Sequence, residues 1–269
     1  MSGSTGTDRV ALRLEDAGEG GRKLLVVYLT AGAPDRESCA EALAGLTAAG
    51  ADAIELGAPF SDPLADGPVI AAASERAIAA GITIRDSIEL GAAYTRVGNG
   101  RSPLILFTYL NPVASVGIEV VADACARAGF EGVLIADLPF DEDPRIEDVL
   151  ASRDLALIRL AAPTTPEDRL AELARGARGF VYLIARTGVT GAGSGTDRRV
   201  AEQVAVIRAN TRLPVVLGFG IADPGSARAA VRLADGVVVG SAFVERLERD
   251  GPRLALAWIR ALRDALDES

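Results

Sequence analysis

Three carboxylates lie within one proline-rich segment of the chain, and one of them is in an unusual position. Glu55 interrupts a short apolar run that is typical of a buried strand, whereas Asp62 and Asp66 follow among prolines and glycines. Burial disfavours an ionised carboxylate and moves its pKa toward the range useful for a general acid-base. Glu55 is therefore a candidate catalytic group. Asp62 precedes a proline and Asp66 precedes a glycine. Asp is common before these residues in turns, so both carboxylates have a structural explanation as well.

Strand periodicity predicts the direction of the Glu55 side chain. Alternation sends Ala53, Glu55 and Gly57 to one face of a strand, and Ile54 and Leu56 to the other. Small residues beside a glutamate favour an interior face with room left for a ligand. The alternative is that Glu55 faces surrounding helices and is neutralised there by an ion pair.

Glycine-rich segments later in the chain indicate an anion site. A Gly- and Thr-rich stretch that contains Gly191 follows Tyr182, and it is typical either of a lid, of an anion-cradling loop or of a simple solvent loop. Gly218-Phe219-Gly220-Ile221 and Gly240-Ser241-Ala242 each follow a candidate strand and precede an expected helix start. Backbone N–H groups and helix dipoles at such points bind phosphate, so we expect a phosphate site there.

The composition excludes several classes of chemistry and partner. The chain has no histidine, which removes His-based triads and His-ligated zinc, and its two cysteines, Cys39 and Cys125, are expected to pack in the core. A formal net charge of -9 argues against nucleic acid as a partner. The N-terminus does not resemble a signal peptide and no apolar run is long enough to span a bilayer, so we expect a cytoplasmic location and no membrane association.

The positions of the apolar runs predict the architecture. Eight short runs are separated by stretches with helical periodicity, and continuous apolar strands are typical of a parallel sheet. The candidate strands are Leu24–Thr30, Ala53–Gly57, Leu104–Tyr109, Gly132–Ala136, Leu155–Leu160, Phe180–Ile184, Pro214–Gly218 and Gly236–Val239. Eight such units favour one (β/α)8 barrel domain over residues 1–269, with an extra N-terminal helix and a loose tail at 1–8. A doubly wound sheet is the alternative, but no G-x-G-x-x-G follows the first strand.

Helix start signals accompany this pattern. Asp35 after Pro34 precedes the first long helix, Thr165-Pro166-Glu167-Asp168 precedes the fifth, and Asp223-Pro224 precedes the seventh. Each is expected to place a capping side chain or a proline at the first turn of its helix.

From about Leu24 to Leu262 the chain resembles the tryptophan synthase alpha-subunit family. The resemblance rests on the block from Ile54 to Pro68, with Ala136-Asp137-Leu138-Pro139, Arg186–Gly191 and the two glycine turns described above. It implies a TIM barrel that cleaves indole-3-glycerol phosphate into indole and glyceraldehyde 3-phosphate by a retro-aldol reaction, without metal or organic cofactor.

The resemblance also implies roles for individual residues. Glu55 matches the acid-base that moves a proton at indole C3, and Asp66 matches the aspartate that holds the indole N–H. The remaining matches are residues of the pocket wall and lid (Tyr28, Tyr182, Thr190 and Phe219) and the phosphate-binding backbone (Gly191, Gly220, Gly240 and Ser241).

The family further implies a pyridoxal-phosphate beta subunit as partner, in an alpha2beta2 complex. Val116 replaces an aromatic residue in the region that faces that subunit in the family. Three other interpretations stay open: a stand-alone lyase that releases free indole, a catalytically silent regulatory subunit, and an isomerase or epimerase acting on another phosphosugar.

Overall fold

The structure, a computed structural model, describes residues 8–63, 66–96, 102–184, 195–218 and 220–269, and for residues 195–197 only the backbone. Its strands all pair in parallel. They are β1 (Leu24–Thr30), β2 (Ala53–Gly57), β3 (Leu104–Thr108), β4 (Gly132–Ile135), β5 (Ala156–Leu157), β6 (Arg159–Ala161), β7 (Val181–Ile184), β8 (Val215–Gly218) and β9 (Gly236–Val239).

These strands form a nearly closed barrel. The sheet order is β5-β4-β3-β2-β1-β9-β8-β7-β6, so its two edges are β5 and β6. Only Ile158 separates those edges along the chain, and its N–H donates to the Val133 carbonyl at 2.9 Å. One continuous backbone segment therefore pairs with β4 on one side and with β7 on the other, which closes the ring and confirms the expected TIM barrel.

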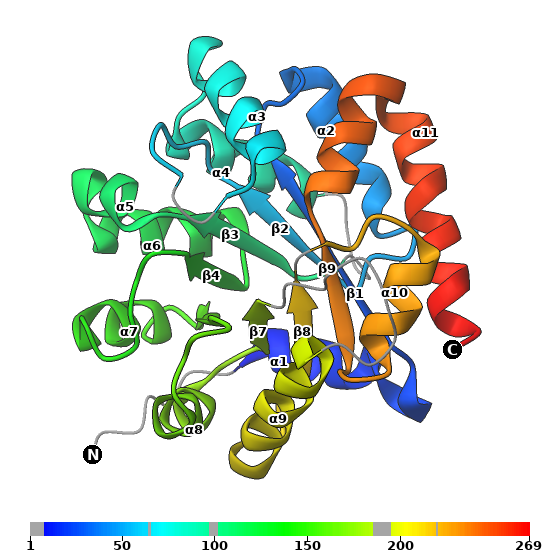
Figure 1. The fold of residues 1–269 in the computed structure, drawn as a ribbon. Helices are drawn as coiled ribbons and strands as arrows, with labels where there is room; N and C mark the ends of the chain where they lie inside the picture. Colours follow the sequence, from blue (N-terminus) through cyan, green and yellow to red (C-terminus); the bar gives the residue numbers. More distant parts are fainter. Residues whose placement is uncertain (1–7, 64–65, 97–101, 185–194, 219) are drawn as a thin grey trace.

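Helices surround the barrel, as Figure 1 shows. Each parallel connection passes through at least one helix, as βα units require. They are α1 (Arg9–Ala17), the short 3-10 helix η1 (Glu19–Gly21), α2 (Arg36–Leu46), α3 (Pro68–Ala79), α4 (Ile84–Thr95), α5 (Leu110–Val116), α6 (Ile118–Ala128), α7 (Pro144–Ala151), α8 (Glu167–Gly176), α9 (Gly195–Asn210), α10 (Pro224–Val231) and α11 (Ser241–Asp267).

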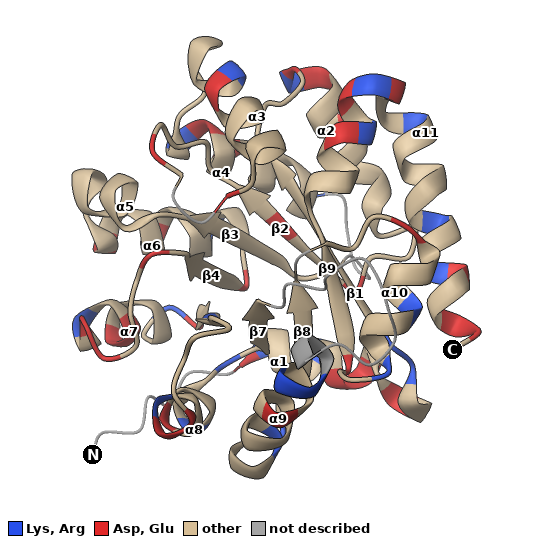
Figure 2. Ribbon diagram, in the orientation of Figure 1, with Lys and Arg blue, Asp and Glu red and all other residues tan. Residues whose placement is uncertain are grey.

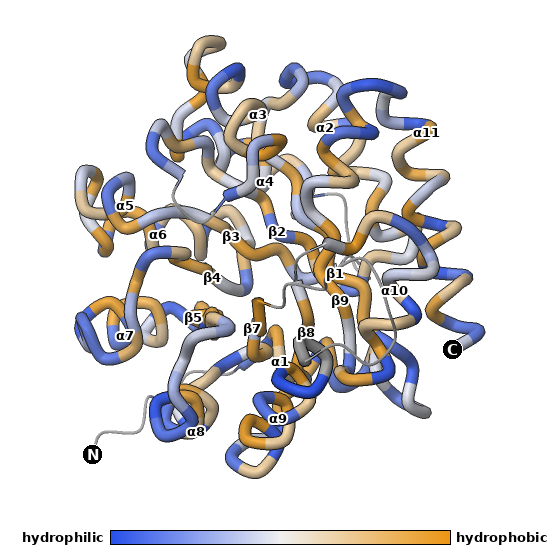
Figure 3. Tube along the Cα trace, viewed as in Figure 1, coloured by the Kyte–Doolittle hydropathy of each residue, from blue (hydrophilic) through white to orange (hydrophobic). Residues whose placement is uncertain are grey.

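Alternate strand residues enter two separate cores. In β2, Ile54 and Leu56 join the larger core between the strands and the helices, whereas Ala53 joins the smaller core inside the barrel. Cys39 and Cys125 are fully buried in the larger core, as expected. Figure 3 shows the central strands as mostly hydrophobic, with hydrophilic segments on the outer helices.

The extra N-terminal helix closes one end of the barrel. Val10 and Leu14 of α1 are buried in the inner core. Asp8 was expected to belong to the loose tail, but it caps α1 through Ala11 and accepts the Gly179 N–H at 2.7 Å. That part of the tail prediction is wrong, because the Asp8 carboxylate satisfies two backbone donors.

The helix starts agree with the sequence signals at two of the three positions. Asp35 caps α2 and Asp223 caps α10 with a capping box. Thr165 does not cap α8, since Pro166 occupies the N-cap and the Thr165 hydroxyl accepts the Ala162 N–H within the preceding turn instead. Within the described part of the chain, no helix combines the length and the apolar character needed to cross a membrane.

Candidate active site

A cavity of about 240 Å³ opens at the carboxyl ends of the strands, the end where barrel active sites gather. It contains most of the site residues expected from the sequence. Those that line it are Tyr28, Glu55, Asp66, Tyr182, Gly220, Gly240 and Ser241. The structure thus brings together the two candidate catalytic carboxylates and the two glycine turns.

Glu55 points into the barrel, as strand periodicity predicted. It lies in β2 between Tyr28 of β1 and Ile105 of β3, and its exposed fraction is 1 %. Figure 2 shows acidic colour within β2, whose single acidic residue is Glu55. Neither carboxylate oxygen has a hydrogen-bond partner among the described residues. Burial raises the pKa of Glu55 to about 8, so the group is mainly protonated at neutral pH and can both give and accept a proton.

Asp66 faces the same cavity from the loop before α3. Burial raises its pKa to about 6, against a hydrogen bond from Tyr109 that lowers it. Tyr109 is 2 % exposed, and its ring centroid lies 5.1 Å from that of Phe60 in the same loop. Tyr109 therefore contacts this loop at both Phe60 and Asp66. With a pKa of about 6, Asp66 is mainly ionised at neutral pH. Asp62 is exposed, accepts a hydrogen bond from Ser61 and does not line the cavity.

Two tyrosines form walls beside the carboxylates, and glycines on neighbouring strands make room for them. A Cβ on Gly57 would clash with the Tyr28 ring, and a Cβ on Gly218 would clash with the Tyr182 ring. Burial, reinforced by the nearby Asp66 and Glu55 charges, raises the pKa of both phenols well above the ordinary value. Both hydroxyls therefore stay protonated at neutral pH.

The expected phosphate end is built mainly by α11. Gly240 is its N-cap and no side chain caps it, so the first-turn N–H groups and the helix dipole favour an anion at Ser241. The glycine turn at Gly220 does not lead directly into a helix, as had been expected. Helix α10 begins only at Pro224, and the Asp223 carboxylate accepts the Ser226 N–H at 2.8 Å. Gly220, with φ +79°, lines the cavity through its backbone rather than by starting a helix.

Three expected site residues, Thr190, Gly191 and Phe219, lie outside the described residues.

The sequence reasoning missed several members of the site. Strand periodicity would have placed Phe107 and Leu160 inside, and helical spacing would have placed Glu245 one turn after Ser241. The hydrogen bond from Tyr109 to Asp66 joins separate segments that no local pattern relates. Among the described residues, no group of three His, Cys, Asp or Glu side chains is arranged to hold a metal ion.

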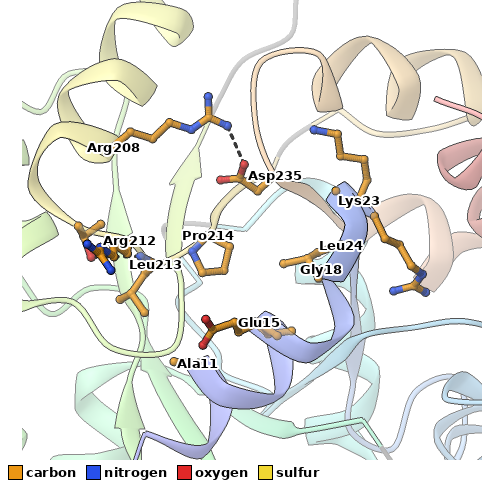
Figure 4. Close-up of a pocket in the computed structure, with 14 residues that line it drawn as sticks. Ala11, Glu15, Gly18, Lys23, Leu24, Arg208, Arg212, Leu213, Pro214 and Asp235 are labelled. Atoms are coloured by element: carbon orange, nitrogen blue, oxygen red, sulfur yellow. Dashed lines mark hydrogen bonds and ion pairs between the residues drawn. The ribbon is translucent and has the colours of Figure 1, made fainter.

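A larger cavity, about 730 Å³, lies at the other end of the barrel, beside α1 and the starts of β1 and β9 (Figure 4). Its basic residues are mostly engaged. Arg208 pairs with Asp235 at 2.7 Å, and Lys23 donates to the Ala234 carbonyl at 3.1 Å. Because these basic side chains already have partners, the cleft is less suited to bind a phosphate than its number of basic residues indicates.

Comparison with known proteins agrees with this geometry. The family model described as Tryptophan synthase alpha chain matches residues 14–266. The tryptophan synthase alpha chain of Synechococcus elongatus is 46% identical over 92% of both chains, and that of Laribacter hongkongensis is 44% identical over 97% of this chain and 99% of its own. A structure of Mycobacterium tuberculosis tryptophan synthase superposes with a TM-score of 0.88 at 33% identity, over 97% of this chain and 99% of the other. The chain therefore belongs to the tryptophan synthase alpha chain family.

Proposed function

We propose that the cavity between Glu55 and Ser241 carries out the alpha reaction of tryptophan biosynthesis, with Glu55 as acid-base and Asp66 as charge stabiliser. Family membership makes the chain a carbon–carbon lyase that cleaves indole-3-glycerol phosphate. The observation that supports these roles is a buried glutamate without hydrogen-bond partners among the described residues, facing a cavity that a second carboxylate shares.

Glu55 has the protonation state that the first step needs. Protonated Glu55 gives its proton to indole C3, which converts the ring into an indolenine whose C=N accepts electrons. The resulting carboxylate takes the proton of the glycerol hydroxyl while the C–C bond breaks and the aldehyde forms. The electrons of that bond restore the aromatic ring, and Glu55 ends protonated, ready for another cycle.

Asp66 complements this step by its charge. Positive charge grows on the ring nitrogen as C3 is protonated, and an ionised carboxylate beside that nitrogen stabilises the transition state more than the ground state. The pKa of Asp66, about 6, leaves it mainly ionised at neutral pH, where Glu55 is still protonated. Their different environments thus give the two carboxyl groups different roles, with Glu55 as proton donor and Asp66 as negative charge.

The other site residues are proposed to bind and enclose the substrate. Tyr28 and Tyr182 wall the indole end of the cavity. The backbone at Gly220, Gly240 and Ser241 is proposed to hold the phosphate. The roles of Thr190, Gly191 and Phe219 rest on the family resemblance alone.

The proposed partner is a tryptophan synthase beta subunit, to which this chain would pass indole. Several matching structures have tryptophan synthase itself as their subject, including an aminoacrylate-bound form from M. tuberculosis with a TM-score of 0.87 at 31% identity. We also propose a cytoplasmic location, and a single domain over residues 1–269, which the one continuous sheet supports.

Indole release tests the proposal. The purified chain is incubated with indole-3-glycerol phosphate, and indole is measured with and without a beta subunit. We expect indole in both cases, faster with the partner, and losses of about 10²-fold to 10⁴-fold in Glu55→Gln and about 10²-fold to 10³-fold in Asp66→Asn. Asp62→Asn, at an exposed carboxylate of the same loop, is the matched control. Rates near that of the unmodified chain in Glu55→Gln or Asp66→Asn would contradict the assignment, and a rate that the beta subunit does not change would favour the stand-alone lyase.

A further inference from the structure

The charge of the cavity is unusual for a site that takes a phosphate. The acidic and basic side chains that line it among the described residues are three carboxyl groups, Glu55, Asp66 and Glu245. Neither lysine nor arginine is among the described lining residues. Within the described part of the site, backbone N–H groups and the α11 dipole are the sources of attraction for the substrate's dianionic phosphate.

Glu245 is the carboxylate nearest in sequence to the expected phosphate position. It lies four residues after Ser241 on α11, which places the two residues on the same helix face. Side chains on a helix lean toward its N-terminus, so the Glu245 side chain, which lines the cavity, is directed toward the turn that begins at Ser241. A negative charge there opposes the helix dipole where an anion would bind.

The basic residues next to Glu245 along the helix are engaged elsewhere. Arg249 makes two hydrogen bonds to Asp250, at 2.8 Å and 2.7 Å. The Arg246 guanidinium lies over the Trp258 ring, 4.2 Å from its centroid. Glu245 is exposed and forms no ion pair with a described residue, although Arg249 is close enough to interact electrostatically with its charge.

We propose that Glu245 weakens the binding of the phosphate group, and so sets the affinity of this enzyme for both substrate and phosphorylated product. The inference rests on the proposed function, because it takes Ser241 to be the phosphate end of the cavity. The phosphate takes no part in bond cleavage, so Glu245 acts equally on ground state and transition state. Its effect falls on KM and on product inhibition rather than on kcat.

The test is a charge series at this position. Glu245→Gln removes the charge and Glu245→Lys reverses it. We expect the KM for indole-3-glycerol phosphate and the inhibition constant of glyceraldehyde 3-phosphate to fall together, by about two- to fivefold in the Gln variant and further in the Lys variant. The differences should shrink as ionic strength rises.

Asp264→Asn is the matched control, since Asp264 is an exposed carboxylate on the same helix, far along it from Ser241. It changes net charge by the same amount and should leave both constants unchanged. Equal constants in the unmodified chain and Glu245→Gln, or an equal shift in Asp264→Asn, would overturn the inference.

Direct binding of inorganic phosphate, measured by calorimetry, separates this inference from the proposed function. If the unmodified chain releases no indole while phosphate affinity follows the charge order at position 245, the proposed function fails and the role of Glu245 stands. If indole is released and phosphate affinity ignores that order, the role of Glu245 fails alone.

Discussion

Replacing Glu55 with glutamine should change how the stability of the protein depends on pH. Glu55 is 1 % exposed, and burial raises its pKa from 4.5 to about 8 in the folded chain. The folded state therefore binds the Glu55 proton more tightly than the unfolded state. The stability that this provides is fully present below the unfolded pKa, falls as pH rises, and is lost once pH has passed through about 8. Glutamine has no ionisation and removes this dependence.

The size of the effect follows from the two pKa values. Between about pH 5 and about pH 8.5, ionisation of Glu55 should lower the free energy of unfolding by about 4 kcal/mol, at about 1.4 kcal/mol for each pKa unit. The Gln amide is also buried without an obvious partner, but its penalty is the same at every pH. The difference in stability between Glu55→Gln and the unmodified chain should therefore shift in favour of the variant by about 4 kcal/mol over this range.

Urea unfolding followed by circular dichroism measures this difference at several pH values. Asp264→Asn, at an exposed carboxylate, should show a nearly constant difference. A difference for Glu55→Gln that stays constant within about 1 kcal/mol would show that Glu55 is not buried as described, and the reasoning about its protonation would fail.

Three further predictions concern the reaction. The pH profile of kcat/KM should be bell-shaped, because activity needs ionised Asp66 and protonated Glu55; it should fall below about pH 6 and above about pH 8, and a flat profile would contradict both roles. Tyr109→Phe removes a hydrogen bond that lowers the pKa of Asp66, so the acid limb should move to higher pH; an unmoved limb would mean that Tyr109 does not act on Asp66. Gly218→Ala adds a Cβ that clashes with Tyr182, so we expect a stability loss of about 1–3 kcal/mol and a raised KM; a variant that matches the parent in urea unfolding and kinetics would show that Tyr182 is free to move.

Much of the fold followed from patterns that act locally. The bounds of β1, β2 and β9 agree with the apolar runs, because a strand buried on both faces has a continuous apolar sequence. The division at Ile158 was not predictable, since the expected run Leu155–Leu160 gives no sign that its two halves pair with different neighbours.

The site was predictable to a similar depth. Alternation in β2 predicted the direction of Glu55, and burial in an apolar strand predicted that its pKa would be raised. The tyrosine that holds Asp66 was missed because that contact depends on how separate elements meet in the barrel. The glutamate beside Ser241 was also missed, although it follows Ser241 by four residues on the same helix. The start of α10 was predicted by Asp223 and Pro224, but the expectation that Gly220 directly precedes a helix start was wrong, because three residues separate Gly220 from Pro224.

The arrangement of the substrate in the cavity is the central claim, and a crystal structure of Glu55→Gln with bound indole-3-glycerol phosphate tests it most directly. The account predicts phosphate oxygens within hydrogen-bond distance of the Ser241 backbone N–H and the indole N–H on Asp66. A phosphate bound instead in the cleft beside Arg208, or an indole ring turned away from Asp66, would contradict it.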